Sequence, residues 1–141
     1  MAVVIDIADA VVAELNKTSF SQPVVAERHY HPRFDLSEMA NLKVSVVPRS
    51  LTSSKLDRSS DSFDYQIDVA IQKRTDTNPV LLDAMMTLVE EIADHFRTKP
   101  LSGYPQARCI EVKNEPIYAL EHLDELRQFT SVITLTFRVW R

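Results

Sequence analysis

Asp64 and Asp68 are the carboxylates whose spacing in this sequence could support chemistry. They lie in residues 63–73, where apolar and polar residues alternate, so a strand would place both carboxylates on one face with Gln66 between them. Paired carboxylates can transfer protons or hold Mg²⁺. The same alternation is expected of any strand with one face toward water or a partner, and we favour this simpler interpretation.

The histidines and the cysteine form no complete catalytic or metal-binding pattern. His29 and His31 would share a strand face, but a zinc site needs further ligands, and the other two histidines are remote in sequence. Cys109 could act as a nucleophile beside a histidine. A free cysteine is more often a small buried apolar residue. We therefore predict no catalytic residues, no metal, no cofactor and a protein that is not an enzyme.

Length and composition narrow the class of protein further. The chain has 141 residues, 45% of them apolar and 26% charged, which fits a single globular domain. Its net charge of -4 argues against a free-standing nucleic-acid binder, which needs a basic surface. The single glycine, Gly103, disfavours most phosphate-binding loops. Apolar runs are only a few residues long, so we expect no contact with a membrane.

Apolar spacing predicts the elements that would position these residues. Asn78 and Pro79 are suited to the start of the clearest helix, as N-cap and first helical residue. We predict helices at 4–16 and 79–99, strands at 24–30, 42–47, 63–73, 107–113 and 129–140, and a short helix or an irregular segment at 116–128. The order α-β-β-β-α-β-(α)-β favours an α+β fold with a mostly antiparallel sheet and two main helices packed on one face.

Residues 49–62 are rich in serine, threonine and charge, and we interpret them as a long polar loop. Arg49, Lys55 and Arg58 form a small basic cluster within it. The cluster could touch a nucleic-acid backbone, but the segment has no aromatic residue on which bases could stack. A flexible polar loop is the simpler interpretation for a monomer, whereas in an oligomer the segment could become an arm that orders on assembly.

Three further residues are candidates for contacts with a subunit or another partner. Glu90 and Glu91 lie on the polar side of the second predicted helix, where they could form half of a charged subunit contact. Trp140 ends a strand that is apolar on both faces, so one of those faces could be covered by a neighbouring subunit. A purely internal role for that strand fits the pattern equally well.

The order of these segments and their local patterns of apolar and polar residues resemble those of the tail terminator, or tail completion, proteins of tailed bacteriophages. The resemblance is carried by the amphipathic helix at 4–15, the strand at 42–48, the polar loop after it, the strand at 63–73 and the helix at 81–92. It extends over nearly the whole chain, although residues 116–128 are less typical of the family. No catalytic motif contributes to it.

The resemblance implies a structural virion protein that is assembled in the cytoplasm of a bacterial host. Such proteins form a ring, here expected to be hexameric, that caps the tail tube and joins it to the head connector. The polar loop would then be a contact arm, and DNA would pass through the lumen without specific binding. A net negative charge would discourage DNA from adhering there. The alternatives are a head-closure or neck adaptor protein and, from another class, a small α+β ligand-binding protein or enzyme.

Overall fold

A computed structural model of the chain describes residues 2–30, 42–55, 57–58, 61–74, 78–114 and 128–140. Its elements, in chain order, are α1 (Val3–Lys17), β1 (Ala26–Arg28), β2 (Lys43–Lys55), β3 (Asp61–Arg74), α2 (Pro79–Thr98), β4 (Arg108–Asn114) and β5 (Gln128–Trp140). The five strands form one sheet in the order β1-β2-β3-β5-β4. Only β1 and β2 run parallel, and the other neighbouring pairs are antiparallel.

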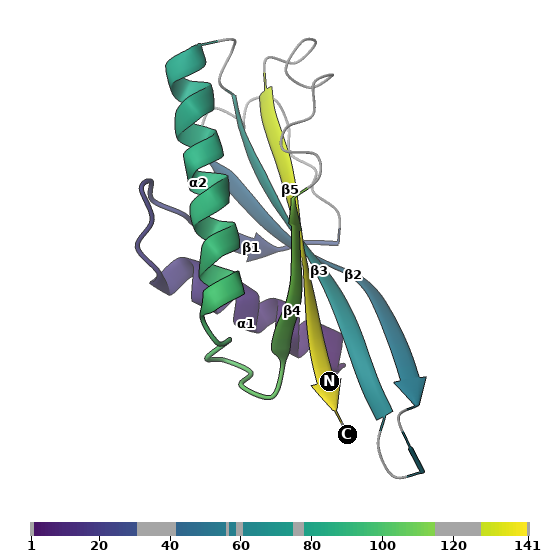
Figure 1. The fold of residues 1–141 in the computed structure, drawn as a ribbon. Helices are drawn as coiled ribbons and strands as arrows, with labels where there is room; N and C mark the ends of the chain where they lie inside the picture. Colours follow the sequence, from purple (N-terminus) through teal and green to yellow (C-terminus); the bar gives the residue numbers. More distant parts are fainter. Residues whose placement is uncertain are drawn as a thin grey trace.

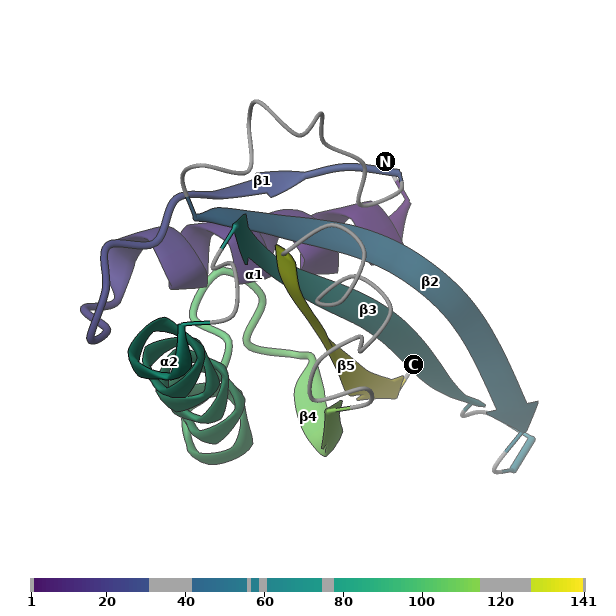
Figure 2. The same cartoon turned by 90° about the horizontal axis from the view of Figure 1, so that it is seen from above.

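This architecture confirms the predicted α+β class, the mostly antiparallel sheet and the order of the elements. Both helices lie on the same side of the sheet, inside its curve (Figures 1 and 2). Helix α1 packs against β1 and β2, whereas α2 packs against β4 and β5. The additional helix considered for 116–128 lies outside the described residues, except that Gln128 begins β5.

The core forms between the two helices and one face of the sheet. In β3, every second side chain enters it, and Ile67, Val69 and Ile71 are completely buried. Directly opposite on β5, Leu135 pairs with Ile67 and Ile133 with Val69, and both are also completely buried. The alternation in the sequence therefore identified the inner and outer faces of this central strand pair correctly.

Helix α2 begins as the sequence predicted. The side chain of Asn78 accepts a hydrogen bond from the backbone N–H of Val80 at 3.0 Å, and Pro79 is the first helical residue. This cap satisfies one of the amide groups that lack an intrahelical partner at a helix start. The buried side chains of α2 recur at helical spacing and face the sheet: Met85, Leu88, Val89, Ile92 and Phe96.

The prediction of a long loop at 49–62 was wrong. Strand β2 continues to Lys55 and β3 begins at Asp61, and the two strands stay paired from Ser50 with Gln66 to Lys55 with Asp61. Figure 1 shows this hairpin, at the lower right, extending beyond both helices. Residues 49–55 of β2 are all exposed, so few apolar residues are required there, whereas Tyr65 on the facing strand β3 is buried. Threonine fits strands well, and cross-strand backbone hydrogen bonds hold the serines in place.

Pro48 was expected to end the strand, but the strand continues through it. A register shift lies between Pro48 and Ser50, so Arg49 is an additional residue on β2. A bulge of this kind accommodates a proline, because the ladder hydrogen bonds are locally interrupted. The bulge marks the point where β2 passes from the core into the projecting part of the hairpin.

Candidate functional site

The outer face of the sheet, which the helices leave uncovered, carries the two carboxylates identified in the sequence. Asp64 on β3 lies directly opposite Arg138 on β5. The Arg138 guanidinium donates from Nε to Asp64 Oδ1 at 2.7 Å and from Nη2 to Oδ2 at 3.0 Å. This two-pronged ion pair lowers the pKa of Asp64, although partial burial opposes the shift. A general acid needs a raised pKa, so Asp64 is poorly suited to that role.

Asp68 belongs to a second polar group on the same face. Its Oδ1 accepts a hydrogen bond from the Thr134 hydroxyl at 2.8 Å and lies 3.5 Å from Nη1 of Arg49. Arg49 also donates to the Thr134 hydroxyl at 3.3 Å. Together with the Asp64–Arg138 pair, these contacts form what we call the polar ladder: Arg49, Asp64, Asp68, Thr134 and Arg138. Its charged groups are paired with one another, so their positions on this face are fixed.

The other candidate residues lie apart from the polar ladder. Lys55 ends β2 and Arg58 follows it, so both are at the far end of the hairpin, whereas the Arg49 side chain contacts Asp68. The predicted basic cluster is therefore divided in two. Trp140 ends β5 opposite Ser62 and is 48% exposed.

Glu90 and Glu91 lie on α2, on the opposite side of the sheet from the polar ladder. Glu90 is exposed, and Glu91 accepts a hydrogen bond from the backbone N–H of Ser21 at 3.2 Å. Glu91 thus holds the segment that follows α1, while Glu90 is available for contact with another molecule.

A buried polar cluster that was not predicted from the sequence joins both helices. Glu14 on α1 is only 5% exposed. Its Oε1 lies 2.9 Å from His95 Nε2 on α2, and its Oε2 accepts a hydrogen bond from the Ser102 hydroxyl at 2.8 Å. Lys17 Nζ lies 3.1 Å from the same carboxylate and also contacts the Ser102 hydroxyl. His95 and Ser102 are more than 80 residues from Glu14, so no local pattern could have revealed the cluster.

This cluster contains a serine, a histidine and an acid, but their arrangement does not suit nucleophilic catalysis. In an activated nucleophile the hydroxyl donates to the base. Here Ser102 donates to Glu14, and His95 Nε2 faces Glu14 rather than Ser102. Lys17 is engaged in an ion pair with the same carboxylate. Burial alone would raise the pKa of Glu14, but the hydrogen bonds from His95, Ser102 and Lys17 outweigh it and lower that pKa.

The cluster instead fastens α1, α2 and the turn at Gly103 to one another. A Cβ at position 103 would lie 3.0 Å from the Cβ of Ala10 on α1, closer than side chains normally approach. The single glycine of the chain thus allows close contact between this turn and α1.

Cys109 lies on β4 and is partly buried. Its thiol lies 3.6 Å from the Glu111 carbonyl oxygen, to which it donates a weak hydrogen bond. Burial raises the pKa of the Cys109 thiol, which disfavours the reactive thiolate. The environment therefore matches a structural cysteine rather than a nucleophile.

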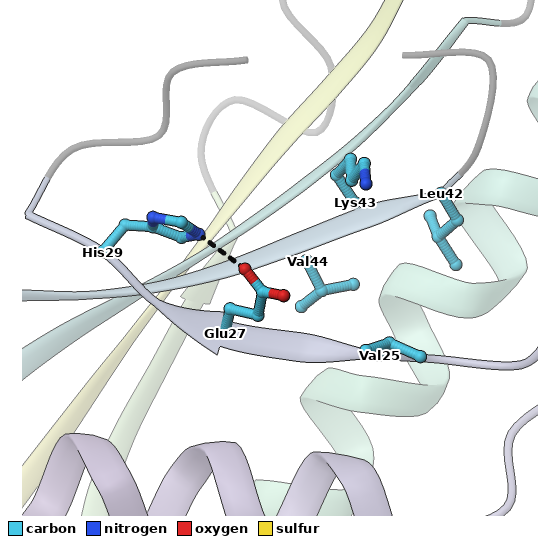
Figure 3. Close-up of a pocket in the computed structure, with 6 residues that line it drawn as sticks. All are labelled: Val25, Glu27, His29, Leu42, Lys43 and Val44. Atoms are coloured by element: carbon cyan, nitrogen blue, oxygen red, sulfur yellow. Dashed lines mark ion pairs between the residues drawn. The ribbon is translucent and has the colours of Figure 1, made fainter. Parts of the chain in front are cut away.

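His29 lies in a small hollow between β1 and the start of β2, drawn in Figure 3. Its Nε2 is 3.4 Å from the Glu27 carboxylate. The hollow has a volume of about 50 Å³, enough for very few water molecules. The second histidine of the predicted pair, His31, lies outside the described residues. Within the described ranges, no three His, Cys, Asp or Glu side chains come together as metal ligands would.

A larger groove of about 390 Å³ opens between the end of α2 and the start of β4. Phe96 and Ala107 are buried at its base, and the cations at its rim are Arg97, Lys99 and Arg108. Arg97 is paired with Asp94 at 2.8 Å. The groove has the charge to receive an acidic segment of another protein.

Comparison of the sequence with protein-family models and with curated proteins found no match. No helix among the described residues is long and apolar enough to cross a membrane.

Proposed function

We propose that this chain is a structural virion protein, a tail terminator whose copies form a ring that caps the phage tail tube and joins it to the head connector. The observation that carries the proposal is the β2–β3 hairpin. Every residue from Arg49 to Lys55 is exposed, and the hairpin extends beyond the helices that cover the core (Figure 1). A monomer gains little buried surface from such an extension, whereas an assembling subunit can use it as an arm.

The remaining surfaces support a role in assembly. A ring requires two different patches on each subunit, because the contact is heterologous. The exposed part of β2, from Arg49 to Lys55, lies toward one edge of the sheet, and the basic groove lies beside β4 at the other. The polar ladder adds a fixed charge pattern on the outer sheet face. These features provide separate places for a neighbouring copy and for the tail tube and connector proteins.

In this proposal six copies form the ring, it resides in the virion between head and tail, and DNA passes through its lumen. The net charge of -4 supports passage without adhesion, because DNA is repelled by a negative surface. The closest alternative is a head-closure or neck adaptor protein, which would use the same kinds of surface. An enzyme is less well supported, because Asp64, Ser102 and Cys109 each have contacts or pKa shifts unfavourable to catalysis.

Electron microscopy of particles assembled without this gene tests the proposal. We expect filled heads and separate tails of abnormal length, since tube growth would not be stopped and the joint would not be made. Supplying the gene from a plasmid should restore joined particles with tails of normal length. Normal tails beside heads that have lost DNA would instead favour head closure. Intact infectious particles would refute a structural role.

A further inference from the structure

The distal part of β2 has an open edge. Strand β1 pairs with β2 only from Val44 to Val46, and β3 occupies the other side of β2 along its length. Among the described strands, none pairs with the free side of β2 beyond that point. Residues 50–54 on this edge are exposed and include neither a charge nor a proline. Proteins usually protect an open edge with such residues, so an unprotected stretch is suited to receiving another strand.

An apolar hollow lies beside this open edge. It has a volume of about 260 Å³ and is lined by Val4 at the start of α1 and by Pro48 to Leu51 of β2. Leu51 is 55% exposed, which is unusual for a leucine within a strand. When a strand adds to a sheet edge, backbone hydrogen bonds supply affinity and hollows for side chains supply specificity. Both requirements are present here.

The opposite edge of the sheet, formed by β4, is also open and carries an exposed apolar side chain that could enter the hollow. Strand β4 pairs with β5 on one side, and no other described strand pairs with its far side. A register shift between Cys109 and Glu111 makes Ile110 an additional residue, and its side chain is 41% exposed. The edge strand β4 therefore carries a large apolar side chain that is partly exposed.

We propose that β4 of one copy adds to the distal β2 edge of the next copy and places Ile110 in the hollow beside Leu51. A second copy is the best-matched occupant for two reasons. It supplies an open strand with an exposed apolar side chain, and Glu111, next to that side chain, would be a second carboxylate for Arg49, which lines the hollow and lies 3.5 Å from Asp68. The contact joins two different edges, so it is heterologous and repeats around a ring. The inference takes its biological setting from the proposed function.

Single substitutions on each side of the junction test this inference. Leu51→Asp and Ile110→Asp each place a charge at an exposed position, so both variants should fold, and melting curves would verify it. We expect sedimentation of the purified wild type over a concentration series to show an oligomer and each variant to sediment as a monomer. The matched control is Val80→Asp, which alters a valine that is 74% exposed on α2, outside the junction, and should assemble as the wild type does.

Mixing the two variants makes the test specific. An Ile110→Asp chain retains the β2 edge, and a Leu51→Asp chain retains the β4 edge, so an equimolar mixture has one intact junction and should form dimers. A mixture that remains monomeric would show that the two edges do not meet. Variants that assemble like the wild type, or a wild type that is monomeric at every concentration, would also overturn the inference.

The test of the junction between copies and the test of the virion role can fail independently of each other. Assembly through this junction, combined with intact particles in the absence of the gene, would retain the junction and remove the virion role. Abnormal tails in the absence of the gene, combined with no effect of either substitution on assembly, would retain the role and remove the junction.

Discussion

The sequence alone left open whether Asp64 acts in catalysis or lies on a polar surface, and its ion pair with Arg138 favours the polar surface. Its position on one strand face with Asp68 could be inferred from spacing. Its ion pair with Arg138 could not, because that partner arrives from β5, 74 residues later. The pairing raises the pKa of the Arg138 guanidinium and lowers that of the carboxyl group, so both groups remain charged. Charge held in fixed positions is more useful to a binding surface than to proton transfer.

At the same scale, the buried Glu14 predicts a pH dependence of stability. The pKa of Glu14 is lowered in the folded protein, so its charged form stabilises the fold above the ordinary glutamate pKa of about 4.3. That contribution is lost as the pH falls through the lowered value. Glu14→Gln should therefore reduce the free energy of unfolding at pH 7 by about 1.5–3 kcal/mol, the scale of hydrogen bonds to a charged group.

Urea denaturation at pH 7 and at about pH 3 measures this effect, and the difference between wild type and Glu14→Gln should narrow at the lower pH. Glu90→Gln is a suitable control because Glu90 is an exposed glutamate on α2, and it should change stability little at either pH. A difference that stays constant with pH would mean that the charge of Glu14 is not what stabilises the cluster.

At the scale of elements, the two helices and the central strand β3 were predictable because each faces one core along its whole length. Their apolar residues recur at 3.6 or 2 positions, and the cap of α2 depends on neighbours in sequence. The distal part of β2 was missed because its side chains at 49–55 are exposed and carry no periodic apolar signal, whereas the facing strand β3 alternates from Phe63 onward. The polar ladder and the Glu14 cluster were missed because their partners are brought together only by the fold.

Substitutions in the buried core and in the exposed part of β2 should reduce the free energy of unfolding by different amounts. Ile67→Ala, at a completely buried position of β3, should reduce the free energy of unfolding by about 2–5 kcal/mol. Leu51→Ala, in the exposed part of β2, should reduce it by no more than about 0.5 kcal/mol in the monomer. Urea denaturation at low protein concentration would compare them. A comparable cost for both would mean that the distal hairpin contributes to the core.

At the scale of the whole molecule, the described residues form one interior and several exposed edges and surfaces that the proposed assembly would use. Both helices lie on one face of the sheet (Figure 2), and the core side chains are buried between them and the sheet. Outside it lie the open edge of β2, the bulged edge of β4, the basic groove and the polar ladder. The open edges of β2 and β4 lie on opposite sides of the sheet, which suits the proposed contact with one neighbouring copy on each side. The polar ladder lies on the outer face of the sheet, where a different protein could bind in the proposed assembly.

The position of the chain within a particle is the most direct test of this account. A small tag at a chain terminus, labelled with gold and imaged on purified complete particles, should place the label at the junction between head and tail. Particles must remain infectious, so that the tag is known not to disturb assembly. The account predicts label confined to that junction. Label spread over the head, or complete particles that lack the chain, would contradict it.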